Sequence, residues 1–259
     1  MKSPLISFQL KDALRNRWLL VYALVIWGIT DLLLRFGGSD GQVLISLSNV
    51  LILFVPLIAV IQSAMYVYGN REYIELMLTQ PVSRTQIWLS LWIGFSLPFV
   101  LVLFVAILLP FAYLLTSWAT FAQVVLVAVT ASLLSAIFSA VAFWMAFKID
   151  DRTKGLAMVL GLWIVMAIIY DGLILILLQM FADYPIEGFL LAITVFNPID
   201  LGRISMLLQM NTSAMMGYTG ALFKQWMGAG GIFYALGLLI VWLTVPLTFS
   251  LRTFKNKDF

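Results

Sequence analysis

Few side chains in this sequence are of the types that perform chemistry, and two residue types are missing altogether. The 259 residues include no His and no Cys. His is the usual general base at neutral pH, and His and Cys supply most ligands for zinc, haem and iron–sulfur clusters. The paired carboxylates Asp150 and Asp151 lie beside Arg152 and Lys154, which is typical of a solvated charge cluster. We therefore expect no catalytic residue, no metal site and no cofactor in this chain.

The sequence also lacks the usual motif for binding a nucleotide. No Gly-x-x-x-x-Gly-Lys-Ser/Thr loop occurs in the sequence, and it is the backbone amides and the lysine of such a loop that cradle ATP phosphates. We expect no nucleotide site in this chain, and nothing in the sequence indicates a nucleic-acid partner.

Two carboxylates stand out because apolar residues surround them. A charged side chain within a membrane segment is costly, so it is a candidate for a transport pathway by default. Asp31 has Arg35 four residues later, a spacing that places both side chains on one helix face and favours an ion pair. Asp171 has no such partner nearby in the sequence, so a pathway or gating role has more weight for Asp171 than for Asp31.

Methionines gather late in the chain. Thioether sulfur is a soft ligand suited to Cu(I), but methionine is also an adaptable filler of apolar interfaces between proteins. Because no His or Cys is present to complete a copper site, we favour interface packing. The residues concerned are Met206, Met210, Met215 and Met216, with Met180 and Met227 at the borders of the same segment.

The elements that must position these residues are membrane spans. The chain is 63% hydrophobic and only 10% charged, whereas a soluble domain has about 25% charged residues. About 20 apolar residues in a helix cross the hydrocarbon layer of a bilayer, and six stretches are long enough. We therefore predict an all-α polytopic integral membrane protein, with residues 1–259 forming one domain. The predicted spans are residues 18–36, 43–69, 87–115, 121–147, 155–181 and 228–250.

The basic residues indicate how these spans are oriented. Lys and Arg precede the first span and occupy the second loop, the fourth loop and the tail, whereas only Arg35, Arg203 and Lys224 lie on the opposite side. Basic residues concentrate on the cytoplasmic side of a membrane protein. Both termini are therefore predicted to be cytoplasmic, as an even number of spans also requires.

Two cytoplasmic segments have features beyond a simple turn. Residues 1–17 mix charged and apolar side chains and are predicted to lie as an amphipathic helix at the cytoplasmic membrane surface. The alternative interpretation is a basic orientation signal with no further role. Within residues 70–86, a short helix is expected to end before Pro81, and Ser83 is expected to cap the next helix. Such a helix could fill a groove on a soluble partner, and the alternative interpretation is a plain surface loop.

The longest segment outside the spans, residues 182–227, is predicted to lie on the outer side. Apolar patches at residues 189–196 and 204–210 are separated by Asn197-Pro198, a turn signal. We expect short helices here, packed at the outer membrane face or against a partner.

Several of these residues together resemble one family. The run from Glu75 to Arg84, which ends in Pro-Val-Ser-Arg, resembles the coupling-helix region of permeases of the ABC type-two exporter class. The basic run that ends at Arg17-Trp18, the six-span layout and Asn197-Pro198 after the fifth span are similar to the same class. The resemblance extends over nearly the whole chain, and the order and spacing of its short motifs make it fairly specific.

The resemblance implies a permease of the bacterial inner membrane that is surrounded by lipid, pairs with a second copy and is driven by a separate cytoplasmic ABC ATPase dimer. ATP and Mg would be bound by that ATPase. Pro81 would shape the coupling segment, Glu75 and Arg84 would make polar contacts with the ATPase, and Leu76 and Leu78 would fill its groove. The implied ATPase-coupling residues are Glu72, Glu75, Leu76, Leu78, Pro81, Val82, Ser83 and Arg84.

A narrower resemblance, carried by residues 196–204 and 212–221, is to transporters that serve the maturation of nitrous oxide reductase. It implies a cargo tied to copper–sulfur centre assembly and a periplasmic partner protein. A permease of a general drug, lipid or peptide exporter is the alternative, and a stand-alone secondary transporter is the other class, although no inverted repeat is evident. Candidate contacts with the periplasmic partner are Asn197, Pro198, Asp200, Arg203, Met206, Met210, Met215 and Met216.

Overall fold

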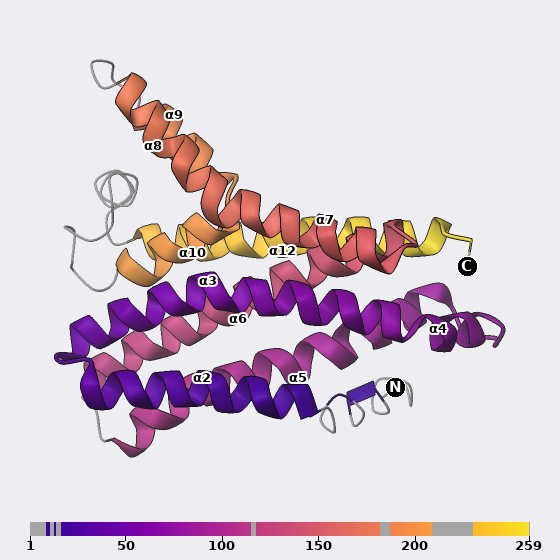
Figure 1. Ribbon diagram of the computed structural model, residues 1–259, viewed down its shortest axis with the longest axis horizontal. Helices are drawn as coiled ribbons and strands as arrows, with labels where there is room; N and C mark the ends of the chain where they lie inside the picture. The colour runs from indigo at the N-terminus through magenta and orange to yellow at the C-terminus, as the bar shows by residue number, and fades with distance from the viewer. Residues whose placement is uncertain are drawn as a thin grey trace.

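The protein is a bundle of long helices (Figure 1). The computed structural model describes residues 9–10, 13, 17–114, 118–181, 187–208 and 230–258. Within these residues six helices are long and apolar enough to cross a membrane, and they overlap the six predicted spans. The predicted all-α polytopic fold is therefore confirmed. The six helices are Arg17–Phe36, Asp40–Gly69, Arg84–Tyr113, Thr120–Lys148, Arg152–Met180 and Gly231–Asn256.

Five of the six spans are single helices, whereas the fifth span along the chain is built from three pieces. The single helices are α2 (Arg17–Phe36), α3 (Asp40–Gly69), α5 (Arg84–Tyr113), α6 (Trp118–Lys148) and α12 (Gly231–Asn256). The fifth span consists of α7 (Arg152–Ile164), the π-helix η1 (Val165–Ile169) and α8 (Tyr170–Met180). Three short helices are α4 (Arg71–Leu78), α9 (Glu187–Val195) and α10 (Pro198–Leu207).

Helix α6 is the centre of the bundle. Helices α3, α5 and α12 pack around it, and small buried side chains such as Ala131, Ser135 and Ala142 line its surface. Small residues let helix backbones approach closely in a membrane, where lipid removes the hydrophobic drive between helices. Leucine, isoleucine and valine face outward along α2, α8 and α12, as expected of surfaces that face lipid.

Local sequence signals set the helix starts. The Ser83 hydroxyl accepts a hydrogen bond from the Gln86 amide at 3.4 Å and caps α5, so this prediction is confirmed. The Asp151 carboxylate caps α7 by accepting from the Lys154 amide at 2.9 Å. Each cap satisfies a backbone amide that the first turn of a helix leaves without a partner.

The outer segment differs from its prediction. Two short helices, α9 and α10, are present as expected, but α10 is buried within this chain. It packs against α12, α6 and α3, and every residue of α10 except Arg203 is buried. Its charged residues Asp200 and Arg203 pair with each other at 3.2 Å, which reduces the cost of burial.

The N-terminal segment also differs where it is described. Gln9 is buried, and the Tyr66 hydroxyl of α3 donates a hydrogen bond to its side-chain oxygen at 2.6 Å. A Cβ on Gly94 of α5 would stand 2.3 Å from Gln9 Cβ, so the chain passes close to α5 at a point where only glycine leaves space. The described part of residues 1–17 around Gln9 is therefore packed against α3 and α5.

Candidate functional site

The short helix α4 forms the turn between the second and third spans. It follows α3 after Asn70 and ends at Leu78, where the Thr79 hydroxyl donates back to the Leu76 carbonyl at 2.8 Å. Pro81 lies beyond this end, and Ser83 then begins α5. The predicted helix that stops ahead of Pro81 is confirmed. Its alternative, a plain loop, is wrong.

The two faces of α4 differ in chemistry. Ile74 and Met77 are buried and fix the helix against the bundle. The opposite face exposes Glu72 and Glu75, and Leu76 beside them has a 57% exposed side chain. An exposed leucine beside carboxylates is suited to a groove with a basic rim on another protein.

Two other residues of the predicted coupling segment face inward. Leu78 and Val82 pack against the core of the bundle, because they lie on the same side of the turn as Ile74 and Met77. The expectation that Leu78 fills a partner's groove is therefore not supported, and Leu76 is the leucine that faces outward.

Arg84 is engaged within the chain. Its guanidinium donates to the Lys255 carbonyl at 2.8 Å and to the Lys257 carbonyl at 2.7 Å, so it joins the first residue of α5 to the end of α12. The last carbonyls of a helix have no partner in the helix itself, and a cation is favoured there. The expectation of a polar contact between Arg84 and an ATPase is replaced by this anchoring role.

An ion cluster joins α4 to the fourth loop and the tail, and sequence reasoning missed it. The Asp150 side chain accepts from the Arg71 guanidinium and from Lys257 Nζ, the latter at 2.7 Å. Arg71 also donates to the Asp150 carbonyl at 2.9 Å. Two hydrogen bonds lower the pKa of Asp150 below its usual value, and the one from Lys257 has a larger effect than the one from Arg71. We call Arg71, Asp150 and Lys257 the Asp150 cluster.

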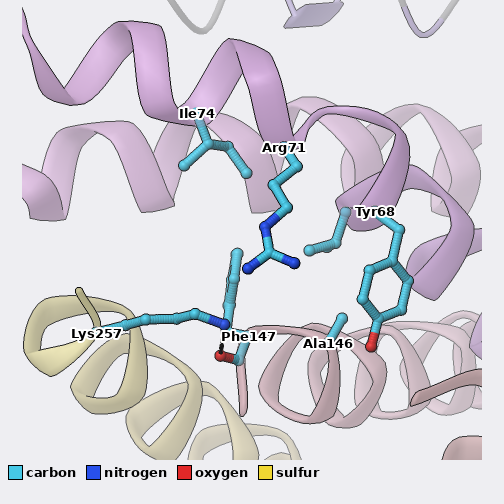
Figure 2. A pocket seen from close by; sticks show the side chains of 7 residues that line it. Tyr68, Arg71, Ile74, Ala146, Phe147 and Lys257 are labelled. Atoms are coloured by element: carbon cyan, nitrogen blue, oxygen red, sulfur yellow. Dashed lines mark hydrogen bonds between the residues drawn. The ribbon is translucent and has the colours of Figure 1, made fainter. Parts of the chain in front are cut away.

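Figure 2 shows the small cavity beneath this cluster, between α3, α6 and the end of α12. Lys257 Nζ reaches across it to the Phe147 carbonyl at 2.7 Å. The cavity has a volume of about 10 Å³, which is at the lower limit for a single water molecule. It is therefore a gap where these helices pack together, and it is too small to hold a cargo. The lining residues are Val67, Tyr68, Arg71, Ile74, Ala146, Phe147 and Lys257.

A glycine completes this joint. The Tyr68 hydroxyl donates to the Ile149 carbonyl at 3.0 Å, and a Cβ on Gly155 would stand 1.7 Å from the same hydroxyl oxygen. Only glycine allows the first turn of α7 to lie against the end of α3. The start of the fifth span, α4 and the tail are thus held together at one end of the bundle.

The two intramembrane carboxylates have different partners. Asp31 pairs with Arg35 at 2.8 Å, which confirms the predicted ion pair, and the Tyr113 hydroxyl of α5 also donates to Asp31. Asp171 has no partner nearby in the sequence, but it has one in the fold. Arg203 of α10 binds its carboxylate at 2.8 Å, a contact between residues 32 positions apart that no local pattern reveals.

The predicted contacts with a periplasmic partner lie mostly in the interior. Asn197 and Met206 have no exposed surface, and Asp200 is 5% exposed. Pro198 is also buried, as the first residue of α10. These side chains therefore contact this chain and not a second protein, whereas Arg203 keeps a third of its side chain exposed. Met210, Met215 and Met216 lie outside the described residues.

Comparison with known proteins agrees with this arrangement. The model of the ABC-2 family transporter protein matches residues 9–259. A probable ABC transporter permease protein NosY from Stutzerimonas stutzeri is 26% identical over 273 residues, and the match covers 96% of each chain. A probable ABC transporter permease protein NosY from Pseudomonas aeruginosa is 24% identical over 270 residues, again with 96% of each chain covered. The chain therefore belongs to the ABC-2 family of transporter proteins.

Proposed function

We propose that this chain is the NosY-like permease of an ATP-driven transporter, and that a separate ATPase subunit docks on the exposed face of α4. Family membership and the two NosY relatives support a permease subunit. The observation that carries the docking site is the exposed Leu76 beside two exposed carboxylates, on a short helix whose other face is fixed to the bundle. A surface of this kind transmits force because it cannot rotate independently of the spans.

The contacts at the same end of the bundle supply a route for that force. Arg71 at the first position of α4 holds Asp150, one residue before the cap of α7. Arg84 at the first position of α5 holds the end of α12. When ATP closes the ATPase dimer and displaces α4, the third, fifth and sixth spans move with it. Paired bundles then change between inward-open and outward-open states.

The remaining parts of the proposal concern the surroundings of the chain. The end that carries α4 and the Asp150 cluster faces the cytoplasm of a bacterium, because Lys and Arg are concentrated there. The ATPase is a NosF-like dimer, the permease is a homodimer, and a NosD-like protein binds on the periplasmic side. The cargo serves copper–sulfur centre assembly of nitrous oxide reductase.

The docking site is tested by Leu76→Asp, which places a third carboxylate on the exposed face of α4. The tagged chain is purified in mild detergent, and co-purified ATPase is counted. We expect Leu76→Asp to lose the ATPase, because an apolar anchor becomes a charge. The matched control is Leu114→Asp, another exposed leucine at the opposite end of α5, which retains the ATPase. Equal ATPase recovery with both variants contradicts docking on α4.

A further inference from the structure

The fifth span is interrupted by η1 midway along its length. A π-helical turn inserted into an α-helix is rare and is frequently found at functional sites. The Met166 carbonyl lies in η1, and Asn197 Nδ2 donates to it at 2.8 Å. The oxygen of the same side chain accepts from the Ile199 amide at 3.0 Å and caps α10. One buried side chain thus links the π-helix to the start of α10.

A second set of contacts continues from this link to α8. Asn197 also donates to Asp200 at 3.1 Å, and Asp200 accepts from Arg203 at 3.2 Å. Arg203 then binds Asp171 in the first turn of α8 at 2.8 Å. We call Asn197, Asp200 and Arg203 the α10 latch. The α10 latch binds the fifth span on both sides of the junction between η1 and α8, at Met166 in η1 and at Asp171 in α8.

The latch connects an element fixed in the bundle to one that leaves it. Helix α10 is buried against α12, α6 and α3, and the Ser205 hydroxyl donates to Thr130 of α6 at 3.2 Å. Helix α8 instead packs on α9 through Ile174 and Ile193. In Figure 1, α8 and α9 lie side by side and diverge from the bundle, whereas α7 runs along it. The change in direction coincides with η1.

We propose that Asn197 and Arg203 are positioning residues that hold the fifth span bent at η1, and that the Arg203–Asp171 ion pair opens when α8 changes its angle. Arg203 has two carboxylates within reach, so it keeps Asp200 as a partner after Asp171 departs. This avoids an unpaired buried cation, which would otherwise block the movement. The opening step rests on the proposed transport function, but the holding role does not.

The absence of cysteine makes a direct measurement simple, because introduced cysteines are the sole labelling sites. Leu175→Cys on α8 and Ile240→Cys on α12 replace side chains that are 66% and 52% exposed. Both positions carry spin labels in the full chain, which is diluted with unlabelled chain so that each assembly holds one labelled copy. Pulsed dipolar spectroscopy in lipid nanodiscs then gives the distribution of the distance between α8 and α12. No ATPase or cargo is needed.

We expect a narrow distribution in the otherwise unchanged chain and a broad or second population in Arg203→Gln. Arg203→Lys keeps one cation in place and restores the narrow distribution, which a general packing defect would not permit. The matched control Asp31→Asn removes another Asp–Arg pair of the same 2.8 Å distance, within α2, and leaves the distribution unchanged. If Arg203→Gln does not yield folded protein, Asp171→Asn, whose side chain is 33% exposed, provides the same comparison.

An unchanged narrow distribution in Arg203→Gln or Asp171→Asn overturns the holding role. This result is independent of the ATPase, so it leaves docking on α4 in place. Conversely, if Leu76→Asp retains the ATPase, docking on α4 is contradicted, but the distances measured between α8 and α12 are unaffected. The two proposals therefore fail separately.

Discussion

At the scale of single residues, the charges in the apolar part of the chain are paired and not isolated. Asp31 has a partner on its own helix, so its pair can be predicted from spacing alone. Asp171 has a partner on α10, and nothing in the residues near Asp171 indicates it. Local patterns therefore predict pairs within a helix, and the fold is needed for pairs between helices.

We expect Asp171→Asn to impair transport more than Asp31→Asn. Asp171 links α8 to α10, whereas the Arg35 contact of Asp31 stays within one helix. Contacts between coupled residues are worth about 0.5–3 kcal/mol, and 1.4 kcal/mol corresponds to a tenfold effect, so a loss of roughly tenfold is expected for Asp171→Asn. Transport is measured in cells or vesicles that contain equal amounts of each folded variant. Equal transport by the two variants contradicts this prediction.

The Asp150 cluster leads to a prediction about pH. Because the folded-state pKa of Asp150 is lowered, its contribution to stability is present above the pKa of the unfolded chain, about 4, and is lost as the pH falls through the folded-state value. Asp150→Asn therefore melts at a lower temperature than the parent protein at pH 7, and the difference disappears in acid. The melting temperature is measured in detergent from pH 3 to pH 8. A difference that persists unchanged at pH 3 contradicts the charge-based explanation.

At the scale of helices, sequence patterns predict those features that depend on neighbours along the chain. The six spans follow from apolar length, α4 from a short amphipathic run that ends before Pro81, and the α5 cap from Ser83. The burial of α10 was not predictable in the same way. Its charged residues can be buried because Arg203 pairs with both Asp200 and Asp171. These contacts depend on how the helices pack, which local patterns do not reveal.

The joint between α3 and α7 gives a prediction at this scale. Gly155→Ala is expected to lower stability by about 1–3 kcal/mol, as overpacking of a core does, because its Cβ would overlap the Tyr68 hydroxyl. Gly161→Ala on the same helix is the matched control, since no atom lies within 4 Å of its Cβ position. Combining Gly155→Ala with Tyr68→Leu should cost less than the sum of the two single changes. Thermal unfolding in detergent measures all four variants, and strict additivity contradicts a direct clash.

At the scale of the whole molecule, the contacts that connect α4 and its neighbours to the spans lie together at one end. Arg71, Asp150 and Lys257 meet there, and Arg84 binds the end of α12 beside them. Gln9 contacts Tyr66 in the last turn of α3, so both described ends of the chain lie on the same side of the bundle (Figure 1). This agrees with the even number of spans.

The central claim is that this permease works only together with a separate ATPase. Its most direct test is to purify the tagged chain from native membranes in mild detergent, and to identify and count what accompanies it. We predict one ATPase with a Gly-x-x-x-x-Gly-Lys-Ser/Thr loop for each permease copy, together with a periplasmic protein. Recovery of the chain alone, under conditions in which a known transporter complex stays intact, would contradict the account and favour a stand-alone secondary transporter.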